Sequence, residues 1–291
     1  MNTKTEAHNY FGKVANVYGD EYHKNYKELG YYPANYYRLL IVKNLLEKIK
    51  PKLILDIGCG TGDPLILLSK EGHNIYGFDY SDSMVKKAKE NLNNNNINPD
   101  KIWKDNMEKI SNCDRKYPCS IALGSLYYAK DFNKSLTEMV KITQKDGDII
   151  FSLRNSLFSL YTLNSYSSSF FIDNLLIKEI LNDDLLNATV ELLESKLEPI
   201  IEMKKQDQIK KNIDELNVHN IQHNPLKIGD ELQNFGLKLN SILFYHYHAS
   251  LPIMEKKFPS EFYSSSSKME NPHDWRGYFM ASAFVVHATK I

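Results

Sequence analysis

Residues 53–62 read Leu-Ile-Leu-Asp-Ile-Gly-Cys-Gly-Thr-Gly, and this stretch decides the fold. The apolar run Leu53–Ile57 is short and ends in glycines, which is typical of a buried strand that turns sharply at its carboxyl end. Gly58 and Gly60 let a ligand approach the backbone where a Cβ would collide with it. A helix predicted from Asp63 directs its N-terminal amide groups at the same place. The sequence therefore predicts a strand, a ligand-binding loop and a helix, in that order.

Strands and helices alternate along the chain on either side of this loop. Besides the run at 53–58, strands are predicted at residues 74–79, 101–106, 119–126, 147–154, 237–248 and 278–289. Helices are predicted between them, one of them capped by Ser81. This alternation predicts an α/β fold with a mostly parallel sheet of seven strands and helices on both faces.

The chain divides into four parts by pattern. They are a helical N-terminal segment, 1–50; an α/β core, 51–154; a helical insertion, 155–225; and the C-terminal part of the core, 226–291. The insertion shows apolar residues at helical spacing and no clear strand. Residues 249–277 contain Pro252, Pro259 and Pro272 and are predicted to be one long loop.

Composition excludes several classes of protein. Lys plus Arg equals Asp plus Glu at 36 each, so a basic surface for nucleic acid is not expected. The three cysteines form no CxxC pair, which argues against a disulfide scaffold and a structural zinc site. His219 and His223 are four residues apart, but no third ligand accompanies them, and no metal is predicted. Without a signal peptide or a membrane-spanning run, a cytoplasmic protein is expected.

A dinucleotide is the natural alternative ligand for such a glycine loop. The dinucleotide fingerprint is GxGxxG, whereas here Gly62 falls one residue early. An anionic pyrophosphate would also lie beside Asp56 and Asp63. These two observations argue against a nicotinamide enzyme.

The run LILDIGCGTG at residues 53–62 resembles the first motif of class I S-adenosylmethionine-dependent methyltransferases. The resemblance implies a Rossmann-like fold whose last strand is antiparallel, with a helical insertion after strand five. It implies S-adenosylmethionine as the cofactor. It also implies that residues 1–50 form a lid and that the insertion caps the substrate.

The same resemblance implies which residues bind the cofactor. For the methionine portion they are Tyr18, Arg38, Asp56, Gly58, Cys59, Gly60 and Gly62. The residues implied to bind the ribose and adenine are Asp79, Tyr80, Asp105, Asn106 and Met107. Gly124 and Ser125 are implied to lie beside the methyl group. A carboxylate such as Asp79 suits a ribose because it accepts hydrogen bonds from both hydroxyls.

Candidate catalytic residues are Tyr127, His246, His248 and His273. His246 and His248 alternate with tyrosines, so both are expected on one face of strand six. An acceptor hydroxyl needs a general base with a pKa near neutrality, which favours histidine. A carboxylate or a free amine needs no base, and a structural role for the histidines stays open.

The predicted function is methylation of a small molecule, by in-line transfer from S-adenosylmethionine. A sugar or polysaccharide precursor is one expected acceptor, because residues 271–288 resemble methyltransferases found with surface-polysaccharide genes. The alternatives are a protein or nucleic-acid methyltransferase and a nicotinamide-dependent oxidoreductase. No nucleic-acid or membrane partner is expected, and the protein is expected to be a monomer or a homodimer.

Overall fold

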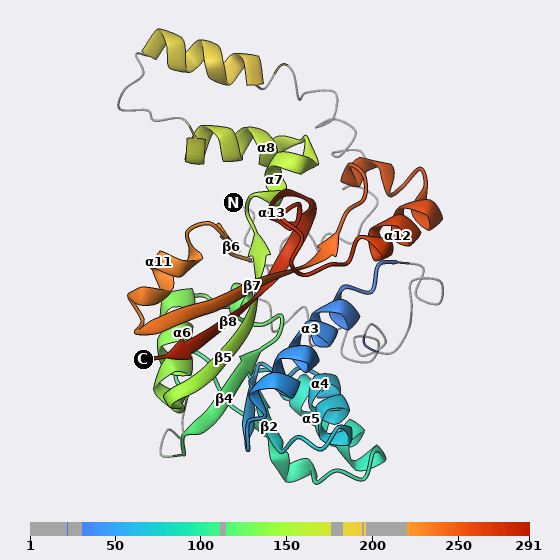
Figure 1. Ribbon diagram of the computed structural model, residues 1–291, viewed down its shortest axis with the longest axis vertical. Coiled ribbons are helices and arrows are strands. Elements are labelled where there is room, and N and C mark those ends of the chain that lie inside the picture. Colours follow the sequence, from blue (N-terminus) through green and yellow to red (C-terminus); the bar gives the residue numbers. More distant parts are fainter. Residues whose placement is uncertain (1–21, 23–30, 111–114, 176–182, 194, 196–219) are drawn as a thin grey trace.

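A computed structural model describes residues 22, 31–110, 115–175, 183–193, 195 and 220–291 (Figure 1). Its centre is one sheet with the order β3-β2-β1-β4-β5-β8-β7, and a short β6 pairs with β5. The strands are β1 Ile54–Ile57, β2 Ile75–Asp79, β3 Ile102–Lys104, β4 Tyr117–Ala122, β5 Thr143–Asn155, β6 Gln222–His223, β7 Leu237–Tyr247 and β8 Ala281–Lys290. The predicted α/β architecture is confirmed.

The last strand is antiparallel to its neighbours in a mostly parallel sheet, as predicted. β1 runs parallel to β2 and β4, and β4 runs parallel to β5. β8 lies antiparallel between β5 and β7. The prediction of no strand in residues 155–225 is wrong for β6, which pairs with the end of β5. Two residues are too few to leave a periodic pattern in the sequence.

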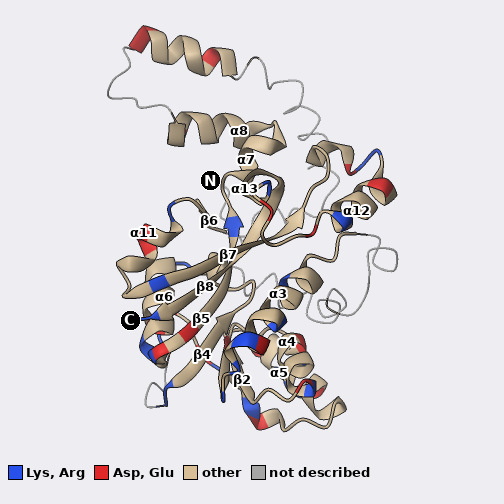
Figure 2. Cartoon of the chain, in the orientation of Figure 1, with Lys and Arg blue, Asp and Glu red and all other residues tan. Residues whose placement is uncertain are grey.

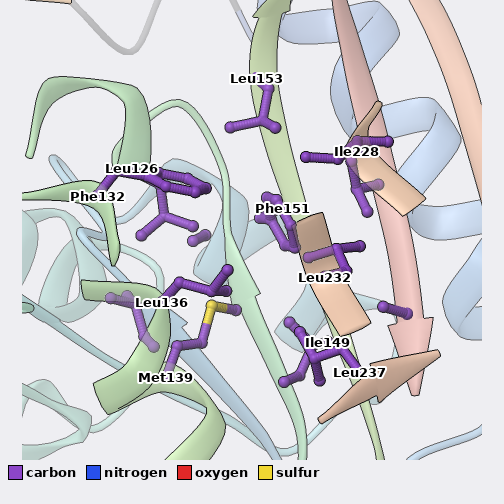
Figure 3. Packing of buried hydrophobic residues seen from close by; sticks show 14 of the residues in the cluster. Leu126, Phe132, Leu136, Met139, Ile149, Phe151, Leu153, Ile228, Leu232 and Leu237 are labelled. Atoms are coloured by element: carbon purple, nitrogen blue, oxygen red, sulfur yellow. The ribbon is translucent and has the colours of Figure 1, made fainter. Parts of the chain in front are cut away.

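Helices cover both faces of the sheet. One face carries α3 (Ala34–Ile49), α4 (Asp63–Lys70) and α5 (Asp82–Asn94), whose apolar side chains bury Ile54 and Ile150. On the other face, α6 (Phe132–Ile142) and α11 (Ile228–Gln233) enclose a second cluster. Figure 3 shows side chains from both helices meeting Ile149, Phe151 and Leu153 of β5. Alternate residues of β5 thus serve opposite cores, as expected for a buried parallel strand.

Residues 249–277 are not one long loop. They contain a short 3-10 helix at Pro252–Met254 and the helix α12 at Pro259–Lys268, and α13 (Gly277–Met280) delays the start of β8. Pro259 is the first residue of α12, where its missing N–H costs nothing. The proline therefore marks a helix start and was misread as a break.

α7 (Phe158–Thr162), α8 (Ser165–Phe170) and α13 lie beyond the carboxyl end of β5, and the helix of residues 183–193 lies farther out, beyond α8 (Figure 1). α7 and α8 follow β5 directly. The bounds of the four predicted parts stay a prediction. In the described part of the chain, no helix is long and apolar enough to cross a membrane.

Candidate functional site

The glycine loop between β1 and α4 is pressed against the chain that follows β4. Gly58 and Gly62 have φ angles of 75° and 80°, in the left-handed region that glycine tolerates best. A Cβ on Gly58 would lie 2.5 Å from the Cβ of Ser125. The Ser125 hydroxyl donates to the Ile57 carbonyl at 2.6 Å and fixes this contact. Because Gly58 has no side chain, the backbone of the loop can pack directly against Ser125.

Acidic side chains at the ends of β2 and β3 line the next part of the site. Asp79 accepts hydrogen bonds from the backbone N–H groups of Gly60 and Ser81, both at 2.9 Å, and burial raises its pKa. Asp105 is buried, and its N–H donates to the Asp79 carbonyl at 3.1 Å. Its carboxylate accepts from the Asn106 N–H. These contacts bring the two predicted nucleoside-binding acids to one edge of the sheet.

Two neighbours of these acids differ in their positions. The terminal methyl of Met107 comes within 3.4 Å of where a Gly58 Cβ would be, so Met107 lies against the loop. Tyr80 is 50% exposed.

Cys59 of the glycine loop is buried, and a Cβ on Gly77 would lie 2.9 Å from the Cβ of Cys59. A small side chain is therefore required at Cys59, and burial raises the pKa of its thiol.

Asp56 is a buried carboxylate without a hydrogen bond. Both of its oxygens lack a partner among the described residues, and burial raises its pKa to about 7. A buried carboxylate that has lost its water and accepts no hydrogen bond is costly, and the nearby charge of Arg38 offsets this cost only in part. A cationic group such as the α-amino group of a methionine moiety would satisfy it. The bare glycine loop and this orphaned acid together fit S-adenosylmethionine.

Arg38 of α3 reaches the same region from above the sheet. Its guanidinium is buried and donates to the Tyr22 hydroxyl at 2.8 Å. A Cβ on Gly124 would lie 2.5 Å from Arg38 Nη1, so this glycine makes room for the guanidinium. The predicted partner Tyr18 lies outside the described residues. The role of Arg38 in binding a carboxylate of the cofactor stays a prediction.

A second group of side chains lies where β5 and β7 end, and we call Tyr127, Arg154, His246 and His248 the histidine cluster. The imidazole ring centroids of the two histidines are 4.9 Å apart. Arg154 lies over the Tyr127 ring, 5.0 Å from its centroid. Tyr127 follows Ser125 by two residues, so the cluster adjoins the glycine loop.

Both strand histidines are neutral at pH 7. Burial lowers the pKa of His248 to about 4, and burial together with His248 and Arg154 holds the pKa of His246 well below its usual range. His248 Nδ1 lies 3.1 Å from the His246 carbonyl, which can only accept. Nδ1 therefore carries the proton and Nε2 of His248 carries a lone pair. His246 Nδ1 instead meets the Ser282 hydroxyl at 2.8 Å.

The two rings share a face because His246 has an unusual backbone. Its φ is 62°, a left-handed value that a side chain with a Cβ rarely adopts. Leu243 and Tyr245 belong to the core on the α3 side, whereas Phe244 and Tyr247 both belong to the opposite core. Residues three apart in a regular strand point to opposite faces. The left-handed backbone at His246 is where the regular alternation of side chains between the two faces of β7 is interrupted.

The remaining candidates lie apart or outside. His273 is exposed, and within the described contacts only its N–H is bonded, to Asn271. Its catalytic role stays a prediction. Across the described residues no group of three metal-ligating side chains occurs, and His219 lies outside them. The sequence predicts that the segment Arg154–Phe158, which leaves strand five directly, lies near the site, but it gives Arg154 no chemical role. Ser282 is not predicted at all, because only strand pairing brings it to His246.

Comparisons with known proteins agree with this geometry. A family model described as a methyltransferase domain matches residues 50–268. The malonyl-[acyl-carrier protein] O-methyltransferase of Buchnera aphidicola is 30% identical over 127 residues, 41% of this chain and 49% of that protein. The ribosomal protein L11 methyltransferase of Lactobacillus gasseri is 34% identical over 105 residues, 36% and 32% respectively. The chain thus spans about half or less of the length of these curated relatives.

Solved structures share the fold at low identity. The magnesium protoporphyrin IX methyltransferase of Synechocystis with bound S-adenosylhomocysteine covers 98% of both chains, with a TM-score of 0.56 and 14% identity. A possible histamine N-methyltransferase of Thermotoga maritima has a TM-score of 0.53 at 14% identity and covers 97% of this chain and 98% of its own. Because the family match covers most of the sequence, the chain belongs to the class I S-adenosylmethionine-dependent methyltransferases.

Proposed function

We propose that the protein methylates a hydroxyl group of a small molecule, such as a sugar or polysaccharide precursor, and that His248 is the general base. The carrying observation is the neutral His248, whose Nε2 lone pair is set by the bond from Nδ1 to the His246 carbonyl. A hydroxyl must lose its proton as the new bond forms, and an uncharged imidazole accepts it. Arg154, which lies over the Tyr127 ring, acts electrostatically on His246, the neighbour of His248.

The cofactor half of the site has a separate task. S-adenosylmethionine, when bound, supplies a methyl group on a positively charged sulfur. Asp56 and Arg38 would hold the two ends of its amino acid portion, and Asp79 would hold its ribose. Aligning the acceptor oxygen with the methyl and excluding water contribute most to such a transfer.

Charge distribution favours a small acceptor over a nucleic acid. In the described residues, Lys and Arg are interspersed with Asp and Glu over α4, α5, α6 and α12, while α7 and α8 carry no charged residue (Figure 2). A nucleic acid would need a continuous basic surface. The relatives are named for acceptors as different as malonyl-[acyl-carrier protein] and ribosomal protein L11, so their names do not identify the acceptor of this chain.

The first test is calorimetric titration with S-adenosylhomocysteine, with NAD as the negative control. We expect a micromolar dissociation constant, weakened at least tenfold by Asp79→Ala and unchanged by Asp82→Ala, the exposed neighbour. Binding of NAD instead would contradict the proposal. Once an acceptor is found by transfer of a labelled methyl group, His248→Gln should reduce kcat at least about 100-fold, the usual contribution of a general base. Unchanged kcat would exclude His248 as the base.

A further inference from the structure

Arg154 is the cationic member of the histidine cluster. It stands one residue before the end of β5 and pairs with Ala283 of β8, which in turn pairs with Tyr245 of β7. Arg154 and Tyr245 therefore flank a small residue on one face of the sheet. Ala283 leaves space for both long side chains to extend over it, at the edge where the parallel strands end.

Phenol and imidazole groups surround this guanidinium. Arg154 lies over the Tyr127 ring and donates a hydrogen bond to the Tyr128 hydroxyl. These tyrosines raise the pKa of Arg154 further, so it stays charged. No carboxylate is among the described groups that act on it. A partly buried cation without a counter-ion is unfavourable, and contact with a tyrosine ring offsets only part of this cost.

The charges of the site are also unevenly divided. Acids gather at the cofactor end, where Asp56, Asp79 and Asp105 line the glycine loop. At the other end both histidines are uncharged, which leaves Arg154 as the cation of the cluster. The cofactor end thus pairs its acids with the cation Arg38, whereas Arg154 faces no described acid in the histidine cluster.

We infer that Arg154 binds a negatively charged oxygen group, a carboxylate or a phosphate, of the methyl acceptor. The inference rests on the proposed function and narrows its acceptor to an anionic one. The planar guanidinium matches two oxygens of either group at once. Tyr127, stacked on the other side, holds the guanidinium plane in place, so it acts as a positioning residue.

The test uses two simple anions on the full-length protein. Orthophosphate is followed by the width of its ³¹P resonance and trifluoroacetate by that of its ¹⁹F resonance, each with and without S-adenosylhomocysteine. We expect millimolar binding of at least one anion, weakened at least tenfold in Arg154→Gln and partly retained in Arg154→Lys. Phosphate binding alone would indicate a phosphorylated acceptor, and trifluoroacetate binding alone a carboxylate. Both results support the inference.

Arg115→Gln is the matched control. Arg115 also lies over tyrosine rings, 4.8 Å from that of Tyr76 and 5.3 Å from that of Tyr117, but precedes β4 at the opposite edge of the sheet. Equal anion binding in wild type, Arg154→Gln and Arg115→Gln, or none in any, would overturn the inference. S-adenosylhomocysteine binding is measured in the same samples: its presence shows that a variant is folded, and its absence from wild type would overturn the proposed function instead.

Discussion

Gly58 is the single residue on which the shape of the cofactor loop most depends. Gly58→Ala places a Cβ against Ser125 in addition to straining a backbone with φ of 75°. Gly72→Ala is a matched control, because Gly72 has φ of 90° and nothing within 4 Å of its Cβ position. Both should lose about 1–2 kcal/mol of folding free energy from the left-handed backbone.

Only Gly58→Ala should lose more folding free energy than the left-handed backbone alone accounts for. It should also weaken S-adenosylhomocysteine binding at least tenfold. Thermal unfolding and calorimetric titration measure the two effects. If the two variants behave alike in both assays, the contact between the loop and Ser125 does not matter.

Residue types with a local signature were predictable at this scale. The glycine loop, Asp79 and the histidine pair stand out because short-range spacing alone singles them out, and the roles of Asp79 and the histidines stay predictions. Arg154 and Ser282 do not, because their partners come from other strands and depend on sheet register. Asp56 was named as a ligand, but its lack of a hydrogen bond is a property of the folded protein alone.

β7 is the element whose irregularity shapes the acceptor end. Since His246 holds the left-handed backbone, His246→Gly should relieve strain and His246→Ala should not. We expect the glycine variant to unfold with a free energy about 1 kcal/mol higher than the alanine variant. Both variants lack the imidazole, so the comparison isolates the backbone. Chemical denaturation measures the difference, and an alanine variant as stable as the glycine variant would show that the strand relaxes there.

Elements were predictable where they are long and periodic. The central strands and α6 follow from apolar runs and helical spacing. The region 249–277 does not, because prolines mark both breaks and helix starts. α13 depends on a distant residue: the Asn155 side-chain amide donates to the carbonyls of Gly277, Tyr278 and Ala281 at 2.8–3.2 Å. No local pattern shows such a contact.

The stability of the whole molecule should carry a pH dependence from its buried acid. Asp56 has a pKa of about 7 in the folded protein, above the ~3.9 of an unfolded chain. Between these values only the folded state keeps the proton. The contribution of Asp56 to the free energy of unfolding is therefore largest below pH ~4. It decreases by at most about 1.4 kcal/mol per pH unit as the pH rises, and it is lost above pH 7.

Asp56→Asn isolates this contribution, because the buried His223 and His248, with pKa values lowered to about 4, act in the opposite direction in wild type. The melting temperature of Asp56→Asn relative to wild type should rise from pH 4 to pH 7 and then stay level. Asp82→Asn, at an exposed position, should show no such trend. A difference independent of pH would mean that Asp56 is already satisfied in the ligand-free protein.

The place of β8 has a consequence for how the molecule is made. β8 lies between β5 and β7, yet residues 281–290 are synthesised after both. At about 5–20 residues per second, β5 exposes for several seconds the backbone N–H and C=O groups that will later pair with β8. Unpaired edges invite association with other chains. The yield of soluble protein should therefore depend on translation speed and chaperone supply between residues 155 and 281 more than on the strength of the finished core.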